Sequence, residues 1–152
     1  MKIYFVLVLL LLFTNTFSQD IEKLKRSDTI YVYFDDNKPN QIHHKDLLKH
    51  KNLNYDIYYF QINSLSSLEF THHYRIAKER RYEKRCFLKK NKDITVNYMF
   101  LKNLGFVDAV KLFYSESGKK KKVYIIEKKS IGWFKIFLKE VTNPSLYPIY
   151  DE

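Results

Sequence analysis

The chain has 152 residues and a formal charge of +10 at neutral pH, and 45% of its residues are hydrophobic and 29% are charged. This balance fits one globular domain, and it excludes a largely disordered chain, a collagen and a protein with several membrane spans. The total charge alone says little about a partner, because a Lys-, Asn- and Tyr-rich composition is also what an AT-rich coding sequence imposes.

The N-terminus has the pattern of a secretory signal peptide over residues 1–18. Lys2 precedes an uninterrupted apolar run from Ile3 to Phe13, and small and polar residues follow that run. The run is too short to span a bilayer core, so we expect cleavage between Ser18 and Gln19 rather than an uncleaved anchor. Cleavage removes Lys2 and lowers the formal charge from +10 to +9. The sequence therefore predicts an exported protein, periplasmic or extracellular, whose mature chain has no transmembrane span.

The first part of the mature chain predicts one strand and one short helix. Residues 19–27 are polar and charged, which predicts a flexible lead-in to the domain. Apolar and polar residues alternate from Thr29 to Phe34, which indicates a strand, and turn-forming residues follow over positions 35–40. Residues 42–51 place their apolar side chains on adjacent parts of a helical surface, so the pattern favours a short helix there.

Two further strands and an ambiguous segment follow. Alternation from Tyr55 to Ile62, and again from Leu68 to Ile76, predicts two strands that pair as an antiparallel hairpin. Residues 78–90 match neither the period of a helix nor that of a strand, and both interpretations stay open.

Basic residues are concentrated around this ambiguous segment. Four of the five arginines lie between positions 75 and 85, an enrichment that an AT-rich coding sequence does not favour. Guanidinium groups bind carboxylate, sulfate or phosphate through a two-point fork, so the stretch is a candidate surface for an anion or a partner. The alternative is a solvated face without a ligand. The candidate residues are Arg75, Arg80, Arg81, Lys84, Arg85, Lys89 and Lys90.

The C-terminal half predicts two helices and a hairpin. Thr95 is expected to cap a helix that ends before Gly105, because a residue without a Cβ suits a left-handed C-terminal cap. A second short helix is expected over residues 106–115. Residues 123–127 and 133–141 then predict two paired strands joined by a short loop.

The order of these elements predicts an α+β fold. Strands, helices and then strands follow one another, without the strict alternation of strand and helix that is typical of a parallel sheet. We expect a single domain over residues 28–152, with one to three helices packed on an antiparallel sheet of about five strands.

No motif in the sequence specifies a reaction, and we expect neither a metal nor a cofactor. Adjacent histidines face opposite sides of a strand, so each pair offers one ligand to a shared site, and a mixed site of His44, His73 and Asp35 or Asp36 is the alternative. Cys86 is expected to be buried as a small hydrophobic residue. If its sulfur were exposed, its basic neighbours would be expected to lower the pKa of the thiol.

Three features mark the ends of the chain: a leader ending in Phe-Ser-Gln, one Lys- and Tyr-rich domain, and a late Val-Tyr-Ile-Ile-Glu strand before Ile-Phe-Leu-Lys-Glu-Val. In these features the chain resembles small exported bacterial proteins of uncharacterised function. The resemblance does not extend to the middle of the chain, and it implies export but no activity.

Three functional hypotheses follow. The first is a non-enzymatic binding domain that contacts a protein or an envelope component through the basic stretch from Arg75 to Lys92. The second is a binder of an anionic polysaccharide or another polyanion, for which export makes nucleic acid the less suitable partner. The third is a small hydrolase that uses His73 or Cys86.

Overall fold

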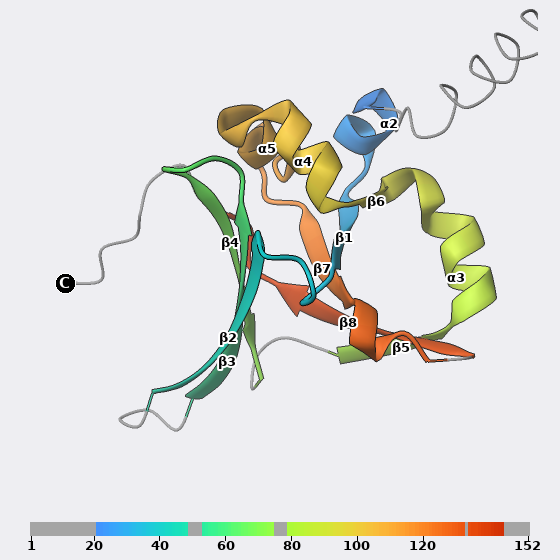
Figure 1. Cartoon of the computed structure of the whole chain (residues 1–152). Coiled ribbons are helices and arrows are strands. Elements are labelled where there is room, and N and C mark those ends of the chain that lie inside the picture. The colour runs from blue at the N-terminus through green and yellow to red at the C-terminus, as the bar shows by residue number, and fades with distance from the viewer. Residues whose placement is uncertain (1–20, 49–52, 75–78, 133, 145–152) are drawn as a thin grey trace, which may run out of the picture.

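The computed structural model describes residues 21–48, 53–74, 79–132 and 134–144, and it shows a single α+β domain with two β-sheets (Figure 1). The predicted signal peptide and its cleavage site at Ser18 and Gln19 lie outside these residues. Within the described part of the chain, no helix has the length and apolar character that a membrane span requires.

The larger sheet has five strands in the order β5-β8-β7-β1-β6. β1 pairs in parallel with β6 and β7, whereas β8 pairs in antiparallel fashion with β7 and β5. The predicted antiparallel sheet is therefore wrong: this sheet is mixed, because long connections separate β1 from β6 and β7 and permit parallel pairing. Its strands are β1 (Thr29–Phe34), β5 (Glu79–Glu83), β6 (Thr95–Val96), β7 (Lys122–Glu127) and β8 (Lys135–Val141).

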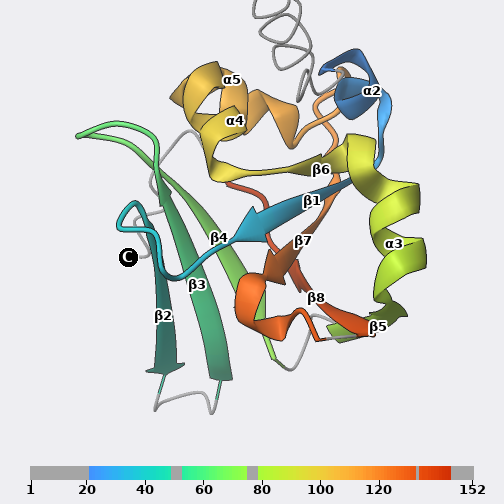
Figure 2. The same cartoon turned by 45° about the vertical axis from the view of Figure 1, so that its right-hand side comes forward.

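The smaller sheet is an antiparallel meander that stands beside the larger one (Figure 2). It consists of β2 (Gln41–Leu48), β3 (Leu53–Gln61) and β4 (Ser67–His73), so the predicted hairpin of β3 and β4 is confirmed. The helix expected over residues 42–51 is wrong, since β2 pairs with β3 along its whole length. Gln41 is buried and Ile42 is exposed, as the two-residue period of a strand requires.

Helices connect the strands of the larger sheet. The segment expected to be a flexible lead-in contains a helix instead, in which Leu24 is fully buried. The ambiguous segment contains both a strand, β5, and a helix, and the helix expected over residues 106–115 is confirmed at residues 106–112. The helices are α2 (Ile21–Arg26), α3 (Lys84–Asn91), α4 (Tyr98–Leu104) and α5 (Phe106–Leu112), with 3₁₀ helices at Lys92–Ile94 and Lys128–Ser130.

Lys121 fastens the end of α2 to the domain. Its side chain is buried, and its Nζ donates hydrogen bonds of 2.8 Å to the carbonyl oxygens of Leu24 and Lys25. These carbonyls belong to the last turn of the helix, where no backbone N–H is left to bind them. Burial lowers the pKa of the Lys121 ammonium.

Gly105 forms the junction between α4 and α5. Gly105 ends α4 as predicted, but it does not form the expected left-handed cap, because its φ of 77° and ψ of 166° lie outside the left-handed helical region, in one that is almost restricted to glycine. Thr95 does not cap α4. That role belongs to Asn97, whose side chain accepts a hydrogen bond from the backbone N–H of Phe100.

The substitution Gly105→Ala is expected to lower the free energy of unfolding by about 1–3 kcal/mol. An added Cβ would meet no atom within 4 Å, so backbone strain is the expected cause. Urea denaturation measures the loss, and Gly132→Ala is the control because Gly132 lies outside the positive-φ region. Equal stability of the two variants would show that this backbone conformation carries no strain.

The two faces of the larger sheet pack against different partners. One face, with Ile30, Val32 and Ile125, joins the smaller sheet, α4 and α5 in the main hydrophobic core. The other face, with Tyr124 and Ile126, forms a second cluster with Phe87 of α3. The second face therefore carries α3, which lies beside the edge strand β5 (Figure 2).

Candidate functional site

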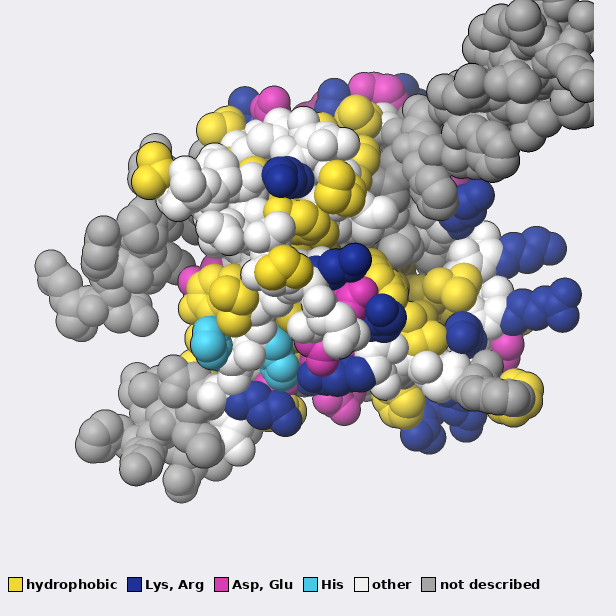
Figure 3. Space-filling view, viewed as in Figure 1, with side chains coloured by type: hydrophobic (Ala, Val, Ile, Leu, Met, Phe, Trp, Pro, Cys, Tyr) yellow, Lys and Arg dark blue, Asp and Glu magenta, His cyan; other side chains and the backbone are white. Residues whose placement is uncertain are grey.

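The predicted basic stretch folds into two consecutive elements at one end of the larger sheet. β5 is the edge strand that pairs with β8, and all five of its residues are exposed. α3 begins directly after it, and over residues 79–91 six basic side chains stand against two acidic ones. We call the exposed side chains of these residues the β5–α3 surface; Figure 3 shows Lys and Arg side chains gathered where α3 and β5 lie.

The structure places most of the predicted contact residues on this surface, but not all on one face. Arg80 lies on the α3 side of the sheet, where its guanidinium carbon is 5.6 Å from the centre of the Tyr124 ring. Arg81 points to the opposite side, 4.5 Å from the centre of the Phe137 ring. Lys84, Arg85, Lys89 and Lys90 lie on α3, and all but the half-buried Lys84 are exposed, while Arg75 lies outside the described residues.

A groove of about 370 Å³ lies between α3 and the larger sheet. Three aromatic rings form part of its wall: the Tyr31 and Phe87 rings meet edge to face at 4.8 Å, and Tyr82 packs 5.6 Å from Phe87. Polar side chains complete the lining, so the groove joins an aromatic wall to a charged rim. The lining residues are Tyr31, Tyr82, Glu83, Cys86, Phe87, Lys90 and Asn91.

Glu83 organises the start of α3 at this groove. Its carboxylate accepts hydrogen bonds from the backbone N–H groups of Arg85 and Cys86, at 2.9 and 2.7 Å, which caps the helix. Bonding to Cys86 lowers the pKa of Glu83, so this side chain remains a carboxylate.

Cys86 differs from both expectations. Its side chain is exposed rather than buried, and the interaction with Glu83 raises the pKa of the thiol instead of lowering it. A raised pKa keeps the sulfur protonated near neutral pH, and the thiolate is the nucleophilic form. This environment does not favour Cys86 as a nucleophile.

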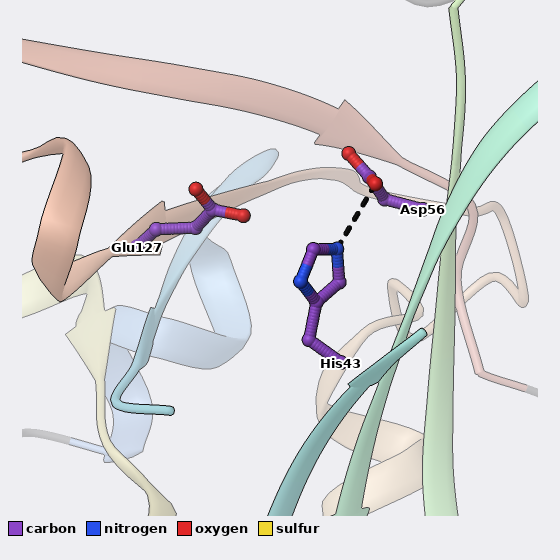
Figure 4. Close-up of side chains that lie close together, drawn as sticks. All are labelled: His43, Asp56 and Glu127. Atoms are coloured by element: carbon purple, nitrogen blue, oxygen red, sulfur yellow. Dashed lines mark ion pairs between the residues drawn. The ribbon is translucent and has the colours of Figure 1, made fainter. Parts of the chain in front are cut away.

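A second candidate site lies between the two sheets, where charged and phenolic side chains form a cluster around the buried Asp56, Tyr58 and Glu127. His43 and Asp56 come from the smaller sheet and Glu127 comes from the larger sheet (Figure 4). The Nε2 atom of His43 is 3.0 Å from an oxygen of Asp56. Lys139 Nζ lies 2.6 Å from Asp56 Oδ2 and 3.2 Å from Glu127 Oε1, so one ammonium bridges the two carboxylates.

Two tyrosines complete this inter-sheet cluster, which we define as His43, Asp56, Tyr58, Tyr74, Glu127 and Lys139. Tyr58 donates a hydrogen bond of 2.6 Å to Glu127, and Tyr74 donates one of 2.6 Å to Asp56. Burial, reinforced by the bonded carboxylates, raises the pKa of both tyrosines, so they act as neutral donors.

Asp56 and Lys139 keep their charges in this cluster. Burial alone raises the pKa of Asp56, but its contacts with Lys139, Tyr74 and His43 outweigh burial and lower the pKa to about 2. Burial likewise disfavours the charged form of Lys139, but the bond to Asp56 and the charge of Glu127 raise its pKa. The cluster is therefore an ion-pair network at neutral pH.

The cluster also contains the one group among the described residues that could hold a metal ion. His43, Asp56 and Glu127 each offer one ligand atom, and these atoms lie within 4.8 Å of one another. However, Lys139 already contacts both carboxylates, and a divalent ion 4 Å from its ammonium would meet a repulsion of about 8 kcal/mol at an effective dielectric constant of 20. The donor set fits Lys139 better than a metal.

The mixed metal site weighed from the sequence does not form among the described residues. His44 is exposed on β2, and neither it nor His73 belongs to a group of three potential ligands. Asp35 instead holds the turn after β1, where it accepts hydrogen bonds from Asn37 and Lys128.

Sequence reasoning missed Asp56, Glu127 and Lys139. A usable signal was present, because Asp56 shares the strand face of Tyr58 and Phe60, which are buried. A charged residue in phase with buried neighbours requires a partner, and Lys139 is that partner. Which cation it meets depends on how the two sheets pack, and that packing was not predicted.

Comparisons with protein-family models, with curated proteins and with solved structures found no match to this chain. The proposal for its function therefore depends on the geometry of the two candidate sites.

Proposed function

We propose that the protein is an exported, non-enzymatic binding domain that contacts a protein or another envelope component through the β5–α3 surface. Export rests on the predicted signal peptide. The observation that carries the binding role is the placement of six basic residues on an edge strand and the helix next to it, with Lys90 in the lining of an aromatic groove. Arginine and aromatic residues are enriched in protein interfaces, and both are present here.

The inter-sheet cluster supports a structural role better than a catalytic one. The side chains of His43, Asp56 and Glu127 are 10%, 0% and 7% exposed, so the groups best suited to proton transfer are turned away from solvent. Lys139 and the two tyrosines bind the carboxylates of Asp56 and Glu127. The hydrolase hypothesis named other residues, His73 and Cys86, and the raised pKa of the Cys86 thiol does not favour it.

The contact surface can be tested with a triple variant, Arg80→Gln, Arg85→Gln and Lys90→Gln. On immobilised heparin, used as an anionic probe, the variant is expected to elute at a clearly lower salt concentration than the parent protein. A plot of the logarithm of the binding constant against the logarithm of the salt concentration has a negative slope. Loss of three ion contacts should reduce the magnitude of that slope by about 2 to 3. Elution of the mature chain in a salt gradient provides the measurement.

The matched control removes the same charge elsewhere, by Lys119→Gln, Lys120→Gln and Lys122→Gln, at three exposed positions. We expect this control to shift elution much less. Equal shifts for the two triple variants would mean that retention reports net charge alone, and the proposed contact surface would then be wrong.

A further inference from the structure

We propose that the groove between α3 and the larger sheet binds an acidic saccharide, one that carries carboxylate or sulfate groups on its rings. This inference rests on the proposed binding function of the β5–α3 surface and names the chemistry of its partner. Three properties of the groove carry it: an aromatic wall, a basic rim and a hydrogen-bonding carboxylate.

The aromatic wall suits a ring with an apolar face. Tyr82 is 39% exposed, and it lines the groove together with Phe87 and Tyr31. A pyranose ring presents C–H groups on one face and hydroxyl groups at its edge, so it can pack against an aromatic ring while its edge stays polar. The groove volume of about 370 Å³ is in the range of small-ligand sites.

The basic rim supplies charge complementarity. Lys90 lines the groove, and Arg80 stands beside it, over the Tyr124 ring on the same face of the sheet. Interaction with the Tyr82 hydroxyl raises the pKa of Arg80. This contact holds the guanidinium next to the aromatic wall. There it can bind a carboxylate or sulfate through two hydrogen bonds, while the ring of the same sugar packs against Tyr82.

Glu83 favours a saccharide over a DNA strand, which also combines rings with negative charge. The Glu83 carboxylate lines the groove and remains charged because it caps α3. A carboxylate accepts hydrogen bonds from sugar hydroxyls, which a pyranose ring carries but a deoxyribose within a DNA strand lacks. Asn91 adds an amide to the lining, which suits hydroxyl groups equally well.

The experiment is isothermal titration of the mature chain with three probes. The first is a galacturonate hexamer, the second is the same hexamer with its carboxylates methyl-esterified, and the third is a thymidine hexamer. The charged galacturonate is expected to bind at least about 10-fold more tightly than either of the others. Tighter binding of the thymidine hexamer would assign the groove to nucleic acid and overturn the proposal.

Variants of Tyr82 test the aromatic wall. Tyr82→Leu is expected to weaken galacturonate binding by about 5- to 20-fold, a loss in the range measured for removal of one stacking ring. Tyr82→Phe keeps the ring but loses the hydroxyl that contacts Arg80, so it should weaken binding less than Tyr82→Leu does. Tyr59→Leu, which removes a half-buried tyrosine from the smaller sheet, should stay within twofold of the parent protein. Unchanged galacturonate affinity in Tyr82→Leu would overturn the saccharide inference.

Heparin retention and galacturonate binding together show whether the saccharide inference or the proposed contact surface is wrong. If the Arg80, Arg85 and Lys90 triple variant loses heparin retention but the parent protein does not bind galacturonate, the saccharide inference alone is wrong. If that triple variant elutes with its Lys119, Lys120 and Lys122 control, the contact surface itself is wrong.

Discussion

Replacing Lys139 with Met is expected to lower the free energy of unfolding by about 3–5 kcal/mol, which is the typical cost of breaking a buried ion pair from one side. The substitution keeps most of the side-chain volume but removes the ammonium that bridges Asp56 and Glu127. Two carboxylates then remain buried between the sheets without a lysine. Urea denaturation followed by circular dichroism measures the loss.

The matched control is Lys111→Met, which removes an exposed lysine from an ion pair with Asp108 in which both side chains are 67% exposed. Exposed pairs of this kind contribute about 0.2–1 kcal/mol, so this variant should remain close to the parent protein. In the double variant of Lys139→Met and Asp56→Asn, the second substitution is expected to recover part of the lost stability, because it removes one of the two uncompensated charges. A cost below about 1 kcal/mol for Lys139→Met would contradict the ion-pair network.

Acid is expected to weaken the fold through the same cluster. The pKa of Asp56 is lowered to about 2 in the folded protein, below its usual value of 3.8. A carboxyl group with a lowered folded-state pKa stabilises the protein fully above the unfolded pKa, and this contribution is lost as the pH falls through the folded value. The free energy of unfolding should therefore fall by about 2 kcal/mol between pH 4 and pH 2 on account of Asp56.

Urea midpoints measured at pH 6, 4, 3 and 2 test this dependence. Asp56→Asn has no titrating group at this position, so the stability difference between parent and variant should shrink as the pH falls from 4 to 2. The bond to Lys128 also lowers the pKa of Asp35. Asp35 is present in both proteins, so its contribution to the pH dependence cancels in the stability difference. A difference that stays constant over this interval would show that Asp56 does not titrate as described.

Local sequence patterns predict those parts of the structure that depend on residues close together in the chain. Gly105 was placed correctly because its backbone conformation excludes other residue types, and β3 and β4 follow from strict alternation. The helix expected in place of β2 failed for the opposite reason. Its apolar residues fit a helical surface, but pairing with β3 along the entire strand overrides that local preference.

Contacts between residues far apart in the chain could not be predicted from local sequence patterns. The parallel pairing of β1 with β6 and β7 joins residues that are far apart in the chain, and no local pattern records it. The basic stretch was visible as composition, whereas the groove beside it requires Tyr31 of β1 to meet Phe87 of α3. The sequence therefore indicated the charge of the candidate site but not its aromatic wall.

We propose that the partner meets the β5–α3 surface and its groove, while the inter-sheet cluster maintains the fold. Amide chemical-shift mapping by NMR, with the galacturonate hexamer added to a labelled chain that begins at Gln19, separates these two roles. We expect shifts at residues 79–91 and at Tyr31, with the amides of His43 and Asp56 unchanged. Shifts centred on His43 and Asp56, with residues 79–91 unaffected, would contradict this assignment of roles.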